Sequence, residues 1–182
     1  MRLALLDRDG VLNEDRPESV RRPEDLVLIP GAAAAVARLN GAGWRVAVIT
    51  NQAVVGRGLM NTADLHRVHL KLETALAEAG AHLDAIVVCT DPPGRPSTRR
   101  KPAPGMLLEA LDRFGAAPET TPMIGDSLRD MEAAAQAGCA RLLVRTGKGA
   151  ATECAGLPAA LQPVTVHDDL VAAVDHLLAP RP

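Results

Sequence analysis

The sequence predicts an α/β fold, a doubly wound, Rossmann-like parallel sheet with helices on both faces. Short runs rich in Val, Leu and Ile alternate along the chain with longer amphipathic segments. The runs are almost continuously apolar, as strands buried on both faces of a sheet are. Strict alternation of strands and helices implies right-handed crossovers between neighbouring parallel strands.

The elements follow one another in a regular order. The first run, at 3–7, ends in a carboxylate, and the later apolar runs also end in polar residues. Between the runs the apolar residues recur with helical spacing, and most of these segments end at or beside a glycine. After residue 147 the pattern weakens before a last strand and a closing helix. The predicted strands are 3–7, 44–51, 85–91, 122–126, 141–145 and 164–166. The predicted helices are 31–39, 62–79, 104–114, 127–137 and 168–178.

Composition limits the classes of function. The chain has 182 residues, 47% of them hydrophobic, so we expect one globular domain over 1–182. Trp44 and Phe114 are the only aromatics and the net charge is -2, which argues against nucleic-acid binding. No apolar stretch approaches a membrane span, and three unpaired cysteines predict no disulfide framework. We therefore expect a cytoplasmic protein.

Polar residues follow several predicted strands. Since ligands in open α/β sheets gather outside the carboxyl ends of the strands, these residues should meet at one edge. They are Asp7 and Asp9 after the first strand, Thr50, Asn51 and Gln52 at the second, Asp126 and Ser127 after the fourth, and Lys101 after the third.

Paired carboxylates at one strand end indicate a cation. Asp7 and Asp9 lie two residues apart and would repel each other unless a positive charge compensates. Mg²⁺ prefers carboxylate oxygens and also neutralises a phosphate, and Asp126 can complete its set. A carboxylate can take up a phosphoryl group, with Thr50 and Lys101 stabilising its oxygens. Taken singly, each of these residues has a simpler explanation as a turn, a cap or a solvated side chain; their combination favours chemistry.

Four ordered motifs carry a family resemblance. They are L-L-D-R-D-G-V at 5–11, V-I-T-N-Q at 48–52, R-K-P-A-P-G-M at 100–106 and G-D-S-L-R-D at 125–130. Together they resemble the haloacid dehalogenase-like superfamily of magnesium-dependent phosphatases. The resemblance implies Asp7 as nucleophile, Asp9 as general acid and base, Thr50 and Lys101 as phosphoryl ligands. It also implies Mg²⁺ on Asp7, the Asp9 carbonyl and Asp126, supported by Asp130.

Longer patterns narrow the resemblance. D-R-D-G-V-L-N, R-K-P-A-P-G-M and R-T-G-K are similar to D-glycero-D-manno-heptose 1,7-bisphosphate 7-phosphatases and the related histidinol-phosphate phosphatases. The connections between motifs are short, so we expect no large cap domain. The substrate would be a small phosphorylated metabolite, in a pathway to lipopolysaccharide precursors. The residues implied to bind it are Asp15, Arg16, Pro17, Glu18, Asn51, Gln52, Arg100 and Ser127.

The chain departs from these families at their zinc loop. Cys89 stands alone, Asp91 replaces the expected histidine, and Ser97 to Arg99 contain no cysteine. Because structural zinc needs four Cys or His ligands, we predict no zinc. His66 and His69 lie three apart on one predicted helix, but no third ligand is evident. We interpret them as a solvated or half-buried face.

Other functions remain open from the sequence. Histidinol phosphate or another sugar phosphate is an alternative substrate, although Arg95, Arg99 and Arg100 favour a bisphosphate. A phosphotransferase using the same aspartyl phosphate is a further possibility. An inactive phosphate-binding scaffold is the non-enzyme alternative. Such a protein would be free to lose Asp7, Asp9, Lys101 or Asp126, and the presence of all four argues against it. No long apolar stripe demands a dimer, so we expect a monomer.

Overall fold

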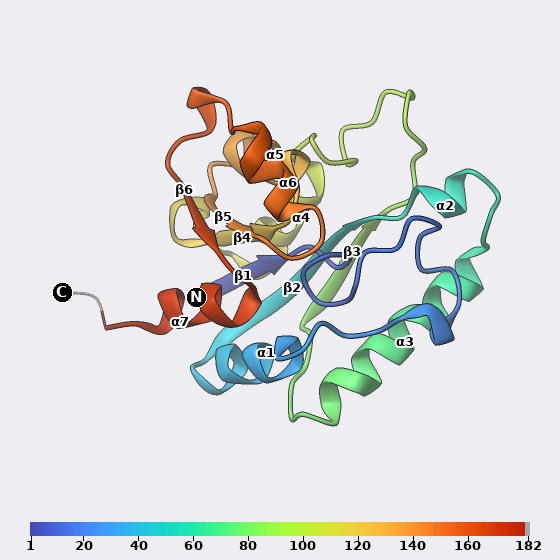
Figure 1. The fold of residues 1–182 in the computed structure, drawn as a ribbon, viewed down its shortest axis with the longest axis horizontal. Coiled ribbons are helices and arrows are strands. Elements are labelled where there is room, and N and C mark those ends of the chain that lie inside the picture. The colour runs from blue at the N-terminus through green and yellow to red at the C-terminus, as the bar shows by residue number, and fades with distance from the viewer. Residues whose placement is uncertain (181–182) are drawn as a thin grey trace.

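A six-stranded, all-parallel sheet forms the centre of the computed structural model, which describes residues 1–180 (Figure 1). The strand order is β3-β2-β1-β4-β5-β6. The first strand is thus central; the chain adds β2 and β3 on one side of it and then β4, β5 and β6 on the other. This confirms the predicted doubly wound α/β fold. The strands are β1 (Arg2–Leu6), β2 (Trp44–Asn51), β3 (Ala85–Cys89), β4 (Pro122–Gly125), β5 (Ala140–Val144) and β6 (Val164–His167).

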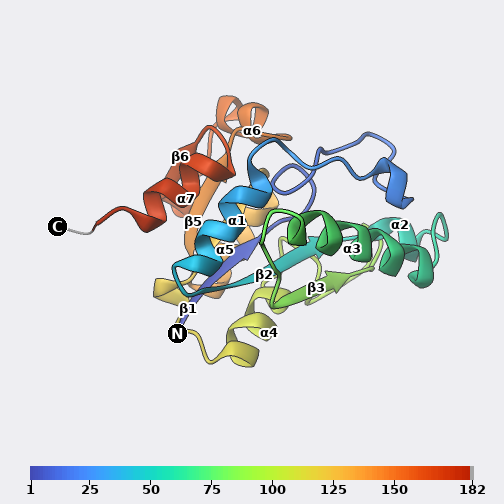
Figure 2. The same ribbon diagram turned by 90° about the horizontal axis from the view of Figure 1, so that it is seen from below.

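Helices cover both faces of the sheet. In Figures 1 and 2, α1, α3 and α7 lie on one face, and α4 and α5 on the other. The helices are α1 (Ala32–Gly41), α2 (Ala53–Gly56), α3 (Thr62–Ala77), α4 (Gly105–Phe114), α5 (Leu128–Ala137), α6 (Gly149–Ala155) and α7 (Leu170–Leu178). Short 3-10 turns occupy Pro23–Asp25, Pro118–Thr120 and Ala159–Leu161.

Alternation along the strands divides the core between the two faces. Ala4 and Leu6 of β1 pack with α1, α3 and α7, whereas Leu3 and Leu5 pack with α4 and α5. All four side chains are fully buried. Successive strand residues point to opposite faces, so a strand covered on both sides must be apolar throughout. This accounts for the continuous apolar runs in the sequence.

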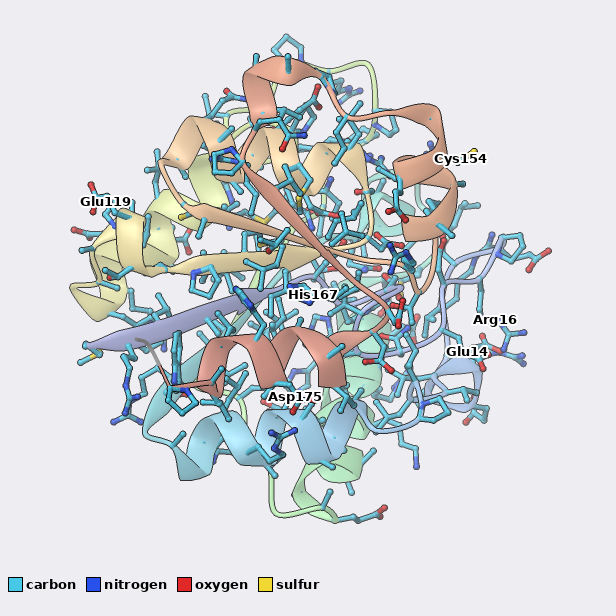
Figure 3. All side chains as sticks on the ribbon, turned by 60° about the vertical axis from the view of Figure 1, so that its left-hand side comes forward. Glu14, Arg16, Glu119, Cys154, His167 and Asp175 are labelled. Atoms are coloured by element: carbon cyan, nitrogen blue, oxygen red, sulfur yellow. The ribbon has the colours of Figure 1, made fainter. Side chains whose placement is uncertain are left out.

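The predicted elements are all present, with boundaries within two residues of those expected. Gly115 and Gly138 end α4 and α5 in the left-handed conformation, whereas α1 runs through Gly41. The short helices α2 and α6 were not predicted. Among residues 1–180, no helix combines the length and apolar character that spanning a bilayer requires. Side chains such as Glu119 and Cys154 project from the outer surface (Figure 3).

Candidate active site

Most of the predicted site residues meet at the carboxyl edge of the sheet. A pocket of about 240 Å³ opens there, lined by carboxylates that follow β1 and β4 and by basic side chains. Its acidic members are Asp7, Asp9, Asp15, Asp126 and Asp130, and its basic members are Arg57, Arg100, Lys101, Arg129 and Lys148. Asn51, Gln52 and Ser127 also line it.

Lys101 joins the first and last motifs. Its side chain is 2% exposed, and Nζ lies 3.0 Å from Asp7 Oδ1, 2.6 Å from Asp130 Oδ1 and 2.8 Å from the Ile49 carbonyl oxygen. Burial acts to lower its pKa, but the charges of Asp130 and Asp7 outweigh it and raise the pKa. Lys101 is therefore a fixed positive charge beside the predicted nucleophile.

Only one carboxylate oxygen of Asp7 is contacted by donors of the described residues. Its Oδ1 accepts from the Arg8 backbone N–H at 2.7 Å as well as from Lys101. Among the described residues, Oδ2 accepts no hydrogen bond. Burial raises the pKa of Asp7 to about 8, with the charges of Asp130, Asp126 and Asp9 adding to the rise and Lys101 opposing it. The carboxylate form thus needs more positive charge than the side chains supply.

Three carboxylates could hold a cation. Oxygens of Asp7, Asp126 and Asp130 lie within 4.8 Å of one another. Burial also raises the pKa of Asp126 to about 6, although the Lys148 N–H donates to its Oδ2 at 2.8 Å. This oxygen-only set, with an excess of negative charge, fits Mg²⁺. The metal ligation implied for Asp7 and Asp126 is consistent with this geometry.

Glycine at position 10 is required by the same cluster. Its φ is 84°, in the left-handed region, and a Cβ there would lie 2.1 Å from Asp126 Oδ2. A side chain at this position would displace the carboxylate of Asp126. The glycine of the D-R-D-G motif therefore lets β1 and β4 present their carboxylates together.

Asp9 is fixed by donors on all sides. Arg8 Nη2 lies 2.9 Å from both carboxylate oxygens, Asn13 Nδ2 donates to Oδ1 at 2.8 Å and Gln52 Nε2 to Oδ2 at 2.9 Å. Burial would raise the pKa of Asp9, but the Arg8 charge and these hydrogen bonds hold it below its usual value. Asp9 rests as a carboxylate.

Several predicted substrate ligands also position the catalytic groups. The Asn51 amide pairs with the Lys101 backbone, accepting from N–H at 3.1 Å and donating to the carbonyl at 3.0 Å. Gln52 links Asp9 to the buried Thr50 hydroxyl at 2.9 Å. Ser127 Oγ donates to Asp130 Oδ2 at 2.6 Å. Their roles toward substrate remain predictions.

The loop after β1 contributes less than predicted. Asp15 reaches the pocket, where its carboxylate pairs with Lys148 Nζ at 2.6 Å. Arg16 and Glu18 instead line a neighbouring groove, because Arg16 donates to the Asp25 carbonyl at 3.3 Å and the Glu18 carbonyl accepts from Arg21. Pro17 lines neither cavity. Figure 3 shows Glu14 and Arg16 at the outer edge of the molecule.

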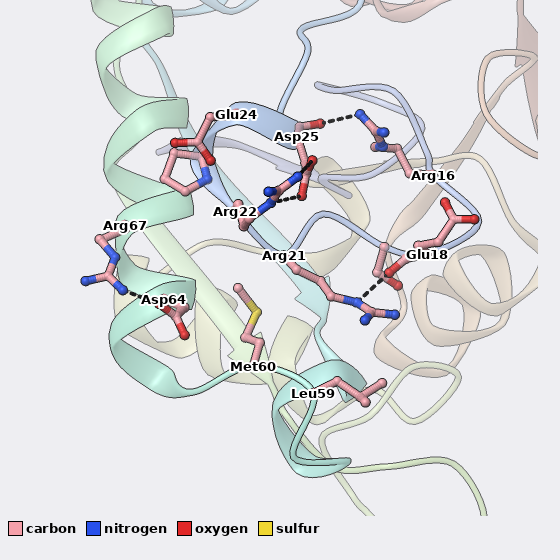
Figure 4. Close-up of a pocket in the computed structure, with 12 residues that line it drawn as sticks. Arg16, Glu18, Arg21, Arg22, Glu24, Asp25, Leu59, Met60, Asp64 and Arg67 are labelled. Atoms are coloured by element: carbon pink, nitrogen blue, oxygen red, sulfur yellow. Dashed lines mark hydrogen bonds and ion pairs between the residues drawn. The ribbon is translucent and has the colours of Figure 1, made fainter.

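The neighbouring groove is larger but chemically balanced. It measures about 730 Å³ and runs between this loop and the start of α3 (Figure 4). Its charges largely pair with one another, as Arg22 does with Asp25 and Arg67 with Asp64. None of the predicted catalytic residues lines it. Volume alone therefore does not mark the site.

A hydrogen-bonded cluster holds the loop where the related families carry zinc. The Asp91 carboxylate accepts from Ser97 Oγ at 2.5 Å and from Cys89 Sγ at 3.4 Å. Ser97 Oγ in turn accepts from the backbone N–H groups of Arg99 and Arg100, at 3.2 and 3.0 Å. The Asp91 carbonyl accepts from Arg100 Nη1 at 3.0 Å. These bonds fix the position of Arg100, the basic residue next to Lys101 in the sequence.

Arg8 and His69 belong to the site but were not predicted to. Arg8 is fully buried, and its Nη1 lies 3.3 Å from His69 Nε2. The interpretation of the two histidines as a solvated or half-buried face is wrong for His69, which is 9% exposed, whereas His66 is exposed. One feature of the sequence could have indicated this contact. Arg8 lies between Asp7 and Asp9, and an arginine side chain that is buried there needs hydrogen-bond acceptors inside the protein.

Comparison with known proteins agrees with this geometry. The HAD-hydrolase-like family model matches residues 98–173. A D-glycero-beta-D-manno-heptose-1,7-bisphosphate 7-phosphatase of Bordetella bronchiseptica is 44% identical over 98% of both chains. The enzyme of that name from Pseudomonas aeruginosa is 39% identical over 97% of both.

Solved structures give the same result. The D,D-heptose 1,7-bisphosphate phosphatase of B. bronchiseptica, complexed with magnesium and phosphate, superposes with a TM-score of 0.94 over 98% of both chains, at 44% identity. That from Burkholderia thailandensis gives 0.78 at 41% identity, over 99% of this chain and all of the other. The chain belongs to the haloacid dehalogenase-like hydrolases, in the family that contains these heptose bisphosphate phosphatases.

Proposed function

We propose that the protein is a magnesium-dependent phosphatase that removes the 7-phosphate of D-glycero-D-manno-heptose 1,7-bisphosphate. The observation that carries the proposal is the Asp7 carboxylate, which has one oxygen free of hydrogen bonds from the described residues. It lies 3.0 Å from the Lys101 ammonium and within 4.8 Å of carboxylate oxygens of Asp126 and Asp130. Relatives at 39–44% identity that carry this activity in their names support the substrate.

Asp7, Asp126 and Asp130 lie where Mg²⁺ would be held, Asp7 and Asp126 as direct carboxylate ligands. The ion would neutralise the carboxylates and the phosphoryl oxygens, which keeps Asp7 ionised and lets an anionic substrate enter. The raised pKa values of Asp7 and Asp126 support this need for a cation.

The chain's own residues supply two steps. Asp7 Oδ attacks phosphorus, the ester P–O bond breaks, and the departing oxygen takes a proton from Asp9. Asp9 then removes a proton from water, whose oxygen attacks the same phosphorus and returns Asp7 as a carboxylate. Asp9 rests ionised, so its first proton must arrive with the substrate, whose negative charge raises its affinity for protons.

A basic rim supports a substrate with a second anionic group. Four basic residues line the pocket at its more exposed side: Arg57, Arg129 and Lys148 are exposed and Arg100 is partly exposed, whereas the carboxylates of Asp126 and Asp130 are buried. Phosphoryl groups are bound mainly by such charges and by positioned donors. No acidic or aromatic residue stands in this rim to favour an imidazole, apart from Asp15, which is paired with Lys148. Histidinol phosphate is thus the second candidate.

We further propose that residues 1–182 act as one catalytic domain and as a monomer in the cytoplasm. Most of the side chains used above line one pocket at one edge of a single six-stranded sheet. Cys89 and Cys139 are buried free thiols, in keeping with a reducing compartment. Gel filtration with light scattering tests the monomer.

The test of function is phosphate release by the purified protein. We expect Mg²⁺-dependent release from heptose 1,7-bisphosphate, faster than from histidinol phosphate or hexose monophosphates, and no release by Asp7→Asn. Preference for histidinol phosphate would replace the substrate. Transfer of the phosphoryl group to added alcohols in place of water would indicate a phosphotransferase. Absence of turnover on a wide phosphate panel would leave the inactive scaffold.

A further inference from the structure

Arg8 stands between the two catalytic carboxylates of the chain yet points into the protein. It is 0% exposed, although arginine is almost never fully buried unless it is paired. Its Nη2 lies 2.9 Å from both oxygens of Asp9, and its Nε lies 3.3 Å from Oδ1. The buried guanidinium therefore donates hydrogen bonds to both oxygens of the Asp9 carboxylate.

His69 meets the other end of the same guanidinium. Its Nε2 lies 3.3 Å from Arg8 Nη1, which has no other hydrogen-bond partner among residues 1–180. Burial lowers the pKa of His69 to about 4, and the charge of Arg8 adds to the effect. At neutral pH the imidazole is therefore uncharged, and Nε2 is free to accept the proton of Nη1.

The helix that carries His69 is firmly anchored. Helix α3 buries Leu65, Val68 and Leu72 in the larger core cluster. At its first turn Asn61 and Asp64 form a capping box. A rigid helix fixes the imidazole, the imidazole fixes Arg8, and Arg8 fixes Asp9.

We propose that Arg8 and His69 are positioning residues that hold the Asp9 carboxylate in line to exchange a proton with the leaving group. The inference rests on the proposed function and adds two residues to its machinery. Without His69, Nη1 of Arg8 would be a buried donor lacking an acceptor, which is unfavourable enough to turn the guanidinium toward water or another carbonyl. Asp9 would then lose the charged donor that contacts both of its oxygens and keep only the amide donors of Asn13 and Gln52.

A role in proton transfer differs from a packing role in its dependence on the leaving group. A sugar alkoxide must receive a proton as the P–O bond breaks, whereas p-nitrophenolate is a stable anion that leaves without one. Misplacing Asp9 should therefore slow the first step, transfer of the phosphoryl group to Asp7, far more for a sugar phosphate than for p-nitrophenyl phosphate. The second step needs Asp9 as a base with either substrate. Loss of folded protein would slow both equally.

The experiment compares His69→Leu with His69→Gln, which keeps an acceptor, and with His66→Leu on the exposed side of the same helix. We expect His69→Leu to lower the single-turnover rate of sugar release from a sugar phosphate by about tenfold or more, part of the ~10²–10⁴ that a general acid contributes. KM should change little, and the single-turnover release of p-nitrophenolate should fall clearly less. His69→Gln should recover most of the single-turnover rate, and His66→Leu should match the unsubstituted protein.

Equal losses in these single-turnover rates, or no loss with either substrate, would overturn the inference. A second measurement keeps it independent of turnover. In heteronuclear NMR of the metal-free protein, the Arg8 Nη groups should give separate signals because the guanidinium is clamped, and His69→Leu should merge them. Merged signals in the unsubstituted protein would refute the clamp. Inactivity with separate signals would refute only the proposed function.

Discussion

Asp126→Asn should stabilise the metal-free protein. Asp126 is 3% exposed, and burial raises its pKa from 3.8 to about 6, with Asp130 adding to the rise. That difference corresponds to roughly 3 kcal/mol of unfavourable free energy for the ionised side chain in the folded state. An asparagine carries no charge, and its Oδ1 can still accept from the Lys148 N–H.

Relaxation and water entry will reduce the gain, so we expect about 1–2 kcal/mol at pH 7.5. For a chain of this size each kcal/mol moves Tm by about 2–4 °C. The sign follows from the raised pKa. As pH rises from about 4 to 6, Asp126 loses its proton in the unfolded state before it does so in the folded state. The unsubstituted protein therefore loses free energy of unfolding over this range, and the variant does not. The difference in Tm should vanish near pH 4 and be complete above pH 6.

Magnesium should reverse the order. At a concentration 100-fold above Kd, a bound ion adds about 2.7 kcal/mol to the unsubstituted protein. Asp126→Asn should gain much less, because it lacks one of the carboxylate ligands. Thermal unfolding with Mg²⁺ or EDTA measures both effects. A variant that is less stable than the unsubstituted protein in EDTA, or equally stabilised by Mg²⁺, would refute the argument.

Three further predictions use the same contacts. Lys101→Met should abolish turnover and lower the free energy of unfolding by about 3–5 kcal/mol, because the buried Asp130 carboxylate and Asp7 lose the positive charge they share; chemical denaturation measures this, and a near-neutral change would contradict it. Ser97→Ala should free the Arg100 backbone and raise KM severalfold with kcat nearly intact, in steady-state kinetics; an unchanged KM would be contrary. The pKa of His69 is depressed, so the native protein should lose up to about 3 kcal/mol as pH falls from 6.5 to 4 beyond what His69→Gln loses. Parallel pH series for the two proteins would disprove it.

The fold was predictable because its signals are local. A buried parallel strand must be apolar on both faces, so each run marked itself in the sequence. Helices α2 and α6 were missed since four and seven residues are too few to show a helical period. Strand order and register depend on pairings between distant segments, and the sequence gives no direct measure of them.

The catalytic centre was predictable for a topological reason. Asp7, Asp126 and Lys101 come from different motifs, but parallel strands place their carboxyl ends at one edge. Arg8 and His69 escaped prediction because they are 61 positions apart and neither position has a periodic pattern that indicates the contact. Both residue types are usually solvated, so only packing reveals that they meet.

The loop residues mark a second limit. Asp15 to Glu18 were predicted together from a resemblance, yet neighbouring residues of an irregular loop point in different directions. Asp15 reaches the pocket while Arg16 and Glu18 line the groove beside it. Similarly, the bond between Asp91 and Ser97 could not be inferred from the absence of zinc ligands, because many loop conformations fit the same composition.

The proposed function depends on a covalent bond between Asp7 and phosphorus. Its most direct test is acid quenching within a single turnover of heptose 1,7-bisphosphate in Mg²⁺, followed by mass spectrometry of the peptide that contains residues 5–13. We predict a transient phosphoryl group on Asp7 that is absent from Asp7→Asn and persists longer in Asp9→Asn when a good leaving group is used. Turnover with no phosphoryl group on this peptide at any quench time would show that Asp7 is not the nucleophile.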